Sequence, residues 1–584
     1  MKSSYILMVF LLCMTQNVLF GQSNTQILRS IPQESAYVHF NESTLFTGEK
    51  LLYKFYGLDN STKKPTKISK IGYVSLIDNN GAVVFSHKLW LDSGSGEGDF
   101  FLPVALSTGT YKLLGYTEWM RNFGRETFFQ ADVYIINPYK TIPEAYLEEP
   151  TDSIQDNSPR EHKSANTISR SNSSPFVNVI VDKTAVGKRE RVAITIERTS
   201  NSATGGSYSL SIRKKGSVSF RTPMSSEAFL MDRNKSVTNR SATTNLYVPE
   251  IRGEVISGIV LEKGTDMPVE NQRISLSLPG EAFLFKVATS DDKGRFSFIL
   301  DRKYSNTVAA VQLMSDAVDK YEVKLDAKEG NHSDLAFPGF TIPRAMENPI
   351  LQRSVHNQIE NAYGEVRMDS VIPVEQITPF YRDLPIVYDL DAYTRFNTLE
   401  ETIVEVTDHL SIKTLNNGSR VFEVRPNVGL PNDKLFAAVF VDGLFVKDHE
   451  DIIGYNAKRV KSINFSRENV LIGSQMFQGV LSLKTIKGDF FNEFYSPDLM
   501  NIELFRPEER KHYFKQMYVG DHDRSRVPDY RYQLLWLPKV DLLGREQEVV
   551  FYTSDVTGTY ELVLEGFTEN GNPVSIKRNL EVVE

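Results

Sequence analysis

Hydrophobic and polar residues alternate along most of the chain, in short runs that are separated by turn-forming residues. Between Ser35 and Pro138, the run Leu51–Tyr56 would place successive side chains alternately toward a core and toward solvent. Two other runs flank Asp78–Gly81, whose Asn-Gly pair supplies the positive φ angles that a tight hairpin needs. The pattern predicts a β-sandwich over residues 35–140.

Two further segments carry the same strand-forming pattern. The run Val192–Ile196 indicates a second β-sandwich over residues 176–246. Near the end of the chain, two more β-type runs are followed by Asn570-Gly571, another hairpin signal. They indicate a separate C-terminal β-sandwich over residues 500–584.

A smaller β unit and a mixed segment lie between these two. Residues 252–340 contain three short β-type runs, and Asp291–Gly294 is expected to form the turn between the last two. Helical spacing follows over Asn348–Tyr363 and again over Leu399–Leu410. With the strands and turns after them, these helices indicate a helical connector and a small mixed α/β domain over residues 345–490.

Composition supports a folded chain of several domains. The 584 residues are 41% hydrophobic and 24% charged, which is typical of soluble globular proteins. Chains of this length divide into roughly three to six domains. The formal charge of −8 is small and its charges are interspersed, so the sequence favours no nucleic-acid partner. Residues 144–174 are rich in Ser, Asn, Pro and charge, and are expected to be a flexible linker.

The first residues have the pattern of an export signal. Residues 1–21 combine a lysine, an apolar run at Tyr5–Leu12 and small or neutral residues at the end, which predicts a signal peptide. The apolar run is shorter than the ~20 residues of a membrane span, and no later segment approaches that length. We therefore expect an exported chain, periplasmic or outer-membrane-associated, with no transmembrane span of its own.

Cysteine usage excludes several kinds of chemistry. The single cysteine, Cys13, lies at the end of the apolar run, where Leu12 precedes it instead of the small residue of a lipoprotein cleavage site. A lipid anchor at Cys13 is the less favoured alternative. Removal of the signal would leave no cysteine, which excludes disulfides, thiolate metal sites, cysteine nucleophiles and thioesters.

Two segments resemble known β-sandwich families. Ala36–His39, Thr47–Glu49, the turn Gly98–Leu102 and Gly109–Tyr111 resemble the macroglobulin-like domain of alpha-2-macroglobulin relatives. The resemblance implies that scaffold, but protease trapping in that family needs a cysteine thioester. The region Glu254–Val260, with the Thr289–Phe296 turn, is similar to the carboxypeptidase regulatory-like domain, which implies a small transthyretin-like sandwich without catalytic residues.

A third segment is similar to the plug domain of TonB-dependent outer-membrane receptors. Phe440–Gly443, Val460–Ile463 and Gly479–Gly488 carry the similarity. Fewer than one hundred residues follow Gly488, too few for the barrel that surrounds such a plug, and no clear TonB-binding box lies near the mature N-terminus. The domain order resembles that of exported envelope proteins of Bacteroidota. The fold class that we expect is mainly β, with tandem immunoglobulin-like and transthyretin-like sandwiches and a small mixed α/β plug-like domain.

Catalytic motifs are absent from the sequence, so we expect no catalytic residues, cofactor or metal. His39 and Glu42 have a spacing found in some zinc peptidases. On a strand, that offset of three residues places the two side chains on opposite faces, and we interpret both as structural.

Two acidic clusters and one aromatic cluster each leave an alternative open. Asp448, Glu450 and Asp451, and also Asp521-His522-Asp523, could offer oxygen ligands to calcium, although solvated loops or ion pairs with nearby arginines are favoured. Four aromatic residues lie close together near the end of the first sandwich, and core packing is favoured over an exposed binding patch. They are Trp119, Phe123, Phe128 and Phe129.

These observations favour a non-enzymatic interaction protein of the cell envelope. Its expected partner is an outer-membrane barrel or a secretion or uptake assembly, since plug modules pack against barrels. The alternative is a surface or periplasmic protein whose sandwiches bind a glycan or peptide. An enzyme is a more distant alternative, which would need carboxylates or histidines that converge in a deep pocket.

Overall fold

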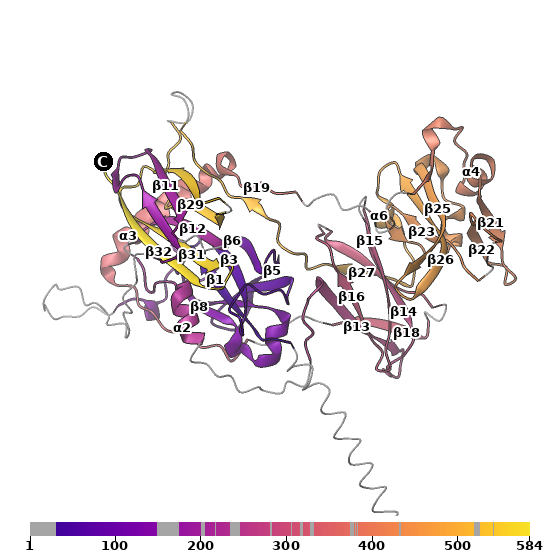
Figure 1. Cartoon of the computed structure of the whole chain (residues 1–584), viewed down its shortest axis with the longest axis horizontal. Helices are drawn as coiled ribbons and strands as arrows, with labels where there is room; N and C mark the ends of the chain where they lie inside the picture. Colours follow the sequence, from indigo (N-terminus) through magenta and orange to yellow (C-terminus); the bar gives the residue numbers. More distant parts are fainter. Residues whose placement is uncertain are drawn as a thin grey trace, which may run out of the picture. The chain divides into compact units, whose positions relative to one another are not determined.

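The computed structural model divides the chain into two compact units (Figure 1). Unit 1 comprises Met1–Ile251, Gly330–Pro373 and Glu508–Glu584, and unit 2 comprises Arg252–Glu329 and Val374–Pro507. The chain therefore passes between the two units four times. The structure describes residues 31–148, 174–199, 205–216, 218–233, 246–280, 283–304, 306–315, 319–326, 332–373, 379, 381, 384–430, 432, 434–518, 526–540, 542 and 544–584.

Unit 1 begins with a β-sandwich made from the N-terminal strands. One sheet has the order β1-β3-β6 and the other β2-β8-β7-β4-β5. The strands are β1 (Glu34–Phe40), β2 (Thr44–Phe46), β3 (Lys50–Asp59), β4 (Ile71–Ile77), β5 (Val83–Trp90), β6 (Ser95–Phe101), β7 (Gly109–Tyr116) and β8 (Phe129–Ile136). The expected hairpin joins β4 to β5: Gly81 has φ 82°, and the Asp78 carboxylate accepts hydrogen bonds from the Asn80 and Ala82 amides. We call this domain the first sandwich.

Strand β3 differs from its sequence prediction, in which every second side chain faces solvent. Lys54 and Tyr56 are both buried. Lys54 Nζ donates to the carbonyl of Pro538 at 2.6 Å, and Tyr56 Oη lies 2.8 Å from Ser209 Oγ. The outer face of the sheet is therefore covered by a second domain of unit 1.

That second domain is one sandwich built from two distant segments, and we call it the composite sandwich. Its sheets have the orders β30-β11-β9 and β10-β32-β31-β12-β29. The strands are β9 (Val177–Val181), β10 (Ala185–Val186), β11 (Arg191–Arg198), β12 (Gly206–Lys214), β29 (Gln533–Val540), β30 (Glu546–Tyr552), β31 (Gly558–Thr568) and β32 (Pro573–Val582).

The composite sandwich corrects the sequence prediction of separate sandwiches over residues 176–246 and 500–584. Strand β11 pairs with β30, and β12 lies between β29 and β31. The buried residues of both segments form one hydrophobic core. Neither segment has enough strands to cover its own apolar face, so each supplies the partner of the other. The hairpin signal at Asn570-Gly571 is confirmed as the turn between β31 and β32, where Gly571 has φ 83°.

Short elements complete unit 1. The helix expected at Asn348–Tyr363 is present as α3. It belongs to unit 1, whereas the sequence predicts that it connects to the α/β domain. A two-stranded antiparallel ribbon pairs Ser370 with His512. Its strands belong to the segment that leaves unit 1 after Pro373 and to the segment that returns at Glu508. The elements are α2 (Ser226–Arg233), α3 (Glu347–Ala362), β19 (Ser370–Val371), β28 (Lys511–His512) and the 3-10 helices η1 (Glu118–Phe123) and η5 (Gly364–Arg367).

Unit 2 contains a small sandwich with sheet orders β16-β13-β18 and β15-β14-β17-β27. The predicted runs form β13, β14 and β16, but β15 lies between the last two, so the Asp291–Gly294 turn joins β15 to β16. The last strand, β27, comes from beyond residue 490 and pairs with β17. The strands are β13 (Glu254–Glu262), β14 (Arg273–Leu278), β15 (Leu284–Thr289), β16 (Arg295–Leu300), β17 (Val308–Leu313), β18 (Tyr321–Leu325) and β27 (Leu499–Glu503).

The second part of unit 2 is a mixed α/β domain, whose sheet has the order β20-β25-β26-β23-β24. One face of the sheet is covered by the predicted helix, now α4, where Leu399 and Ile403 are buried and Leu410 begins the next strand. The elements are β20 (Ile386–Asp389), α4 (Leu399–Val406), β21 (Leu410–Thr414), β22 (Arg420–Val424), β23 (Ala438–Val441), β24 (Leu444–Phe445), α5 (Glu450–Ile453), β25 (Val460–Ile472), β26 (Gln475–Thr485) and α6 (Phe490–Glu493).

The mainly β fold class predicted from the sequence is confirmed, with tandem sandwiches and one mixed domain. The signal peptide predicted at residues 1–21 lies outside the described residues, as does most of the linker predicted at 144–174. Within the described part of the chain, none of the helices has the length and apolar character needed to cross a membrane.

Candidate functional site

His39 and Glu42 do not form a metal pair. His39 is buried on β1, where its Nδ1 lies 2.6 Å from Ser209 Oγ of the composite sandwich. Burial, followed by the charges of Lys577 and Lys54, lowers the pKa of His39 to about 3. Glu42 lies beyond the end of β1 and accepts a hydrogen bond from the Ser43 amide at 2.9 Å. Because β1 ends at Phe40, the two residues do not lie on opposite faces of one strand as expected, and their structural role stays a prediction.

The acidic cluster at residues 448–451 organises a helix start. The Asp448 carboxylate accepts from the Glu450 amide at 3.1 Å, and the Glu450 carboxylate accepts from the Arg420 amide at 3.2 Å. Burial, followed by the charge of Asp448, raises the pKa of Asp451. Among the residues that the structure describes, no group of three or more His, Cys, Asp or Glu side chains is placed to hold a metal ion. Calcium binding at this cluster therefore gains no support.

The second acidic cluster, Asp521-His522-Asp523, lies outside the described residues. Its neighbour Asp529 forms a buried ion pair with Arg531, with nitrogen–oxygen distances of 2.6 and 2.7 Å. Burial would raise the pKa of Asp529, but the Arg531 guanidinium lowers it. Arg531 therefore serves the core of unit 1.

The aromatic cluster of the first sandwich is core, as favoured from the sequence. Trp119, Phe123 and Phe129 are buried. Phe128 is half-buried and stacks on Tyr116 with ring centroids 4.5 Å apart. These side chains therefore offer no exposed aromatic patch.

The turn Asp442-Gly443 fixes one end of the α/β sheet. Both residues have positive φ, 47° and 85°, which is the conformation of a tight hairpin turn between β23 and β24. The Asp442 carboxylate accepts hydrogen bonds from the Thr485 amide at 2.8 Å and from Thr485 Oγ1 at 2.6 Å. One side chain thereby ties the turn to the end of β26, which explains the Val-Asp-Gly sequence structurally.

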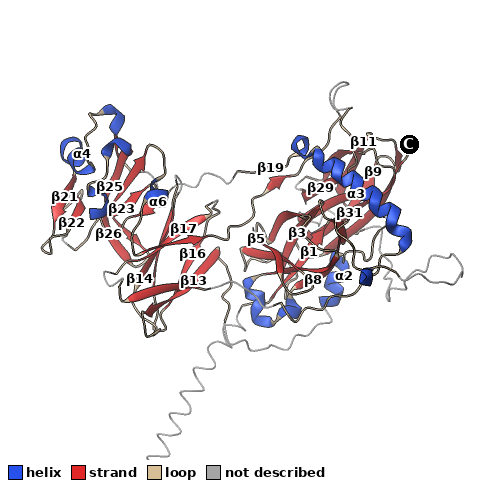
Figure 2. Ribbon diagram, turned by 180° about the vertical axis from the view of Figure 1, so that it is seen from behind, coloured by secondary structure: helices blue, strands red, loops and turns tan. Residues whose placement is uncertain are grey.

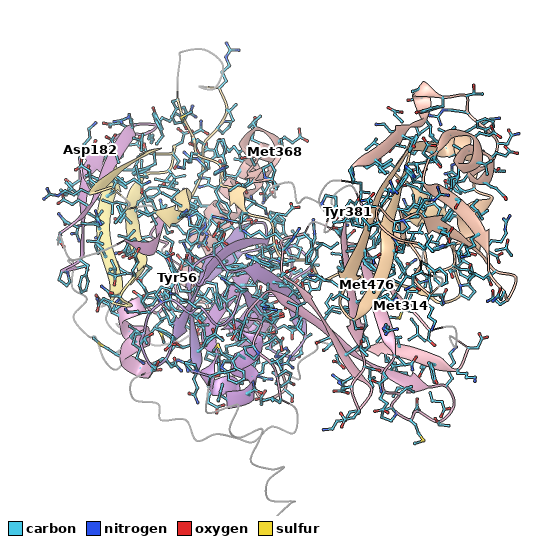
Figure 3. The ribbon with its side chains drawn as sticks, turned by 45° about the vertical axis from the view of Figure 1, so that its right-hand side comes forward. Tyr56, Asp182, Met314, Met368, Tyr381 and Met476 are labelled. Atoms are coloured by element: carbon cyan, nitrogen blue, oxygen red, sulfur yellow. The ribbon has the colours of Figure 1, made fainter. Side chains whose placement is uncertain are left out.

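The α/β domain and the small sandwich share an aromatic core within unit 2 (Figure 3 labels Met314, Tyr381 and Met476 around it). Phe283 and Phe285, from the small sandwich, lie with ring centroids 5.0 Å from that of Phe440 on β23. These rings cover one face of β23 and β26, while α4 and the β21–β22 hairpin cover the other. The two faces of the central strands β23 and β26 are therefore occupied, so neither face of these strands is free to meet a partner.

One loop of the α/β domain exposes large apolar side chains. Val428 is 90% and Leu430 is 91% exposed, on either side of Gly429, which has φ 86°. We call residues 425–436, of which the structure describes all but 431 and 433, the apolar loop. Exposed apolar side chains are common singly, but two that are almost fully exposed at one loop tip indicate a contact surface.

The stem of the apolar loop is anchored on both sides. Arg467 Nε and Nη2, from β25, donate to the carbonyls of Arg425 at 2.7 Å and of Pro426 at 2.8 Å. On the other side, the Gln478 amide of β26 donates to the carbonyl of Phe436 at 2.9 Å. The loop tip is thus presented from a fixed base.

Sequence reasoning missed the apolar loop. Its residues Pro426–Leu430 have neither the helical nor the strand period, so periodicity gives no signal. A usable signal is the pair of apolar residues between turn-forming Pro, Asn and Gly, because loops are normally polar. The exposed side chains of Val428 and Leu430 offer apolar contact.

Comparison with known proteins gives weak similarity. No family model matches the chain, and no curated protein matches it. A Salmonella alpha-2-macroglobulin reacted with methylamine aligns with a TM-score of 0.23 and 9% identity, covering 94% of this chain and 39% of that one. Escherichia coli alpha-2-macroglobulin activated by porcine elastase aligns with a TM-score of 0.24 and 8% identity, covering 94% of this chain and 44% of that one.

An Escherichia coli adhesin, FdeC, aligns over less of the chain. The TM-score is 0.14 with 12% identity, and the alignment covers 49% of this chain and 62% of the adhesin. The chain spans less than half the length of the alpha-2-macroglobulins that it matches. TM-scores this low support no conclusion about the fold or the function of this chain.

Proposed function

We propose that the protein is a non-enzymatic interaction protein of the cell envelope that associates with an outer-membrane barrel or a secretion or uptake assembly through the apolar loop of unit 2. The observation that carries this proposal is the almost complete exposure of Val428 and Leu430 on an anchored stem. The predicted signal peptide and the plug-like sequence at Phe440–Gly488 motivate the choice of partner.

The energetics fit an anchor that is part of a larger interface. Full burial of a Val or Leu side chain stabilises a complex by about 1.5–3 kcal/mol each. Association costs at least about 4 kcal/mol in lost translational and rotational freedom, so two side chains alone do not hold a partner. Interfaces concentrate their binding free energy in a few such anchors while the surrounding contacts exclude water.

The test is co-purification of the tagged protein from detergent-solubilised envelopes, followed by mass spectrometry. The variant Val428→Asp/Leu430→Asp places two charges at the loop tip, where both side chains are almost fully exposed. Val104, a 55% exposed loop residue of the first sandwich, supplies the matched control Val104→Asp.

We expect the wild type and Val104→Asp to retain a stoichiometric barrel protein, and the double variant to lose it at least tenfold. Recovery of all three proteins without a partner would reject a stable complex and favour glycan or peptide binding by the sandwiches. Equal recovery of a barrel with all three would reject the apolar loop as the contact.

A further inference from the structure

Helix α3 of unit 1 buries polar side chains against the first sandwich. Arg353, Asn357 and Asn361 recur at every fourth position and face inward. Asn357 Nδ2 donates to the carbonyl of Thr47 at 2.9 Å, and Asn361 Nδ2 donates to that of Gly48 at 3.0 Å. Helices on globular proteins usually bury an apolar stripe, whereas the inner face of α3 buries Ile350 among mostly polar side chains.

Arg353 is the centre of this contact. Its Nε and Nη2 lie 2.8 and 2.7 Å from the two carboxylate oxygens of Glu49, and Nη2 also donates to the carbonyl of Thr44 at 3.0 Å. Burial would raise the pKa of Glu49, but Arg353 and then Arg213 lower it to about 2. Charge and hydrogen bonds, together with the buried Ile350, therefore hold the inner face of α3, and apolar residues are also present on the other side.

The outward face of α3 carries those apolar residues. Leu351 is 62% and Val355 is 45% exposed, and Ile359 and Ala362 continue the stripe. At 3.6 residues per turn these four side chains fall within about a quarter of the circumference, opposite Asn357. Beyond the helix, on η5, Val366 is 61% exposed. Figure 2 shows α3 lying across the outside of the strands of unit 1.

We propose that this outward stripe docks an amphipathic helix of a partner protein, with its own apolar stripe flanked by lysine or arginine. A straight row that repeats every three to four residues matches the ridges and grooves of a second helix. From Leu351 to Ala362 the row is about 17 Å long at 1.5 Å per residue, or three turns of a helix. This proposal does not depend on the apolar loop of unit 2.

The charges along α3 and η5 select the partner. Of the five charged residues there, Arg353 pairs with Glu49 and Arg367 pairs with Glu360. The two that have no ion pair among the described residues are both carboxylates, Glu347 and Glu365, at opposite ends of the row. An anionic membrane attracts helices flanked by Lys and Arg, so it does not fit this face. A second copy in antiparallel orientation would bring Glu347 near Glu365, and like charges oppose that arrangement.

The test uses a single photoreactive group on the stripe of the full chain. Because Cys13 is the one cysteine of the sequence, Cys13→Ser/Val355→Cys carries a benzophenone-maleimide at one position. The matched control is Cys13→Ser/Val83→Cys, since Val83 is 50% exposed on β5. Each labelled protein is illuminated in a detergent extract of the cells that produce it, and cross-linked peptides are sequenced by mass spectrometry.

We expect cross-links from position 355, absent from position 83, to a segment with apolar residues at helical spacing and flanking Lys or Arg. Adding Leu351→Gln/Val366→Gln should lower their yield at least tenfold without changing the Tm, whereas Gln358→Ala should leave the yield unchanged. Cross-links to another copy of the chain, to lipid or to a segment without helical spacing would overturn the proposal. So would a yield equal to that of position 83, or one unaffected by the double substitution.

Discussion

Single buried polar residues between the two sandwiches of unit 1 decide how those domains associate. His39 meets Ser209, and Lys54 donates to Pro538, both across the interface. The sequence predicts that alternate residues of Leu51–Tyr56 face solvent, because a strand pattern does not show what covers its outer face. The spacing argument against a His39–Glu42 metal pair assumed that both residues lie on one strand, but β1 ends at Phe40. The partner of His39 could not be predicted either, since it lies 170 residues away.

Acid is expected to destabilise unit 1 through His39. Its pKa is about 3 in the folded protein, below the ordinary 6.5, so the unfolded state binds the proton first as pH falls. The stabilising effect is complete above pH 6.5 and is lost between pH 6.5 and 3. From pH 7 to 5, His39 should lower the free energy of unfolding by about 2 kcal/mol.

Urea unfolding measured at pH 7, 6 and 5 checks this, and tryptophan fluorescence reports on unit 1 because Trp90, Trp119 and Trp536 all lie there. His39→Asn should show a shallower pH dependence than the wild type. The exposed His512 gives the control His512→Asn, which should keep the wild-type dependence. A His39→Asn protein with an unchanged dependence would contradict the assignment.

Removal of the Arg353 guanidinium should strongly destabilise unit 1. Arg353→Met leaves Glu49 buried with Arg213 as its remaining partner, and breaking a buried ion pair in this way costs about 3–5 kcal/mol. The control is Arg221→Met, whose side chain is 64% exposed beside Asp132 and should cost less than about 1 kcal/mol. The same fluorescence-detected unfolding applies. Equal losses in the two variants would show that Arg353 does not hold α3.

At the scale of elements, most strands and the helices α3 and α4 could be predicted, because periodicity and turn residues are local signals, whereas α2, which is as long as α4, was not. The turns at Gly81 and Gly571, and the helices α3 and α4, follow from such signals. Strand partners could not be predicted, since pairing depends on which apolar faces need covering. The composite sandwich shows this, because β11 and β30 are neighbours in space and more than 300 residues apart in the chain.

A designed disulfide tests the composite sandwich. Thr195 is opposite Glu548 in the β11–β30 ladder, and both side chains lie on the outer face. Cross-strand neighbours are close enough to bridge, so Cys13→Ser/Thr195→Cys/Glu548→Cys should oxidise to an intramolecular disulfide, as peptide mapping would show. The control Cys13→Ser/Thr195→Cys/Glu581→Cys pairs strands of different sheets and should remain reduced. A disulfide in the control alone, or in neither protein, would refute the pairing.

At the scale of the whole molecule, the sequence order of domains is not their order in space. Both units are assembled from separated segments, and the chain passes between them four times. Analysis of the sequence from one end to the other predicts too many domains for such a chain. Each segment that returns to an earlier unit has the pattern of a separate domain. The two candidate surfaces were also missed. The apolar loop follows no hydrophobic period, and the exposed apolar face of α3 has the same period in the sequence as a buried face.

The measurement that tests the central claim most directly is hydrogen exchange of the protein alone and of the complex recovered from envelopes. The account predicts that amides of the apolar loop, residues 425–436, exchange at least tenfold more slowly in the complex, while β1 and β3 of the first sandwich are unchanged. If the loop amides exchange in the complex at the same rate as in the protein alone, and amides of the sandwiches are protected instead, the assignment of the binding surface to unit 2 is contradicted.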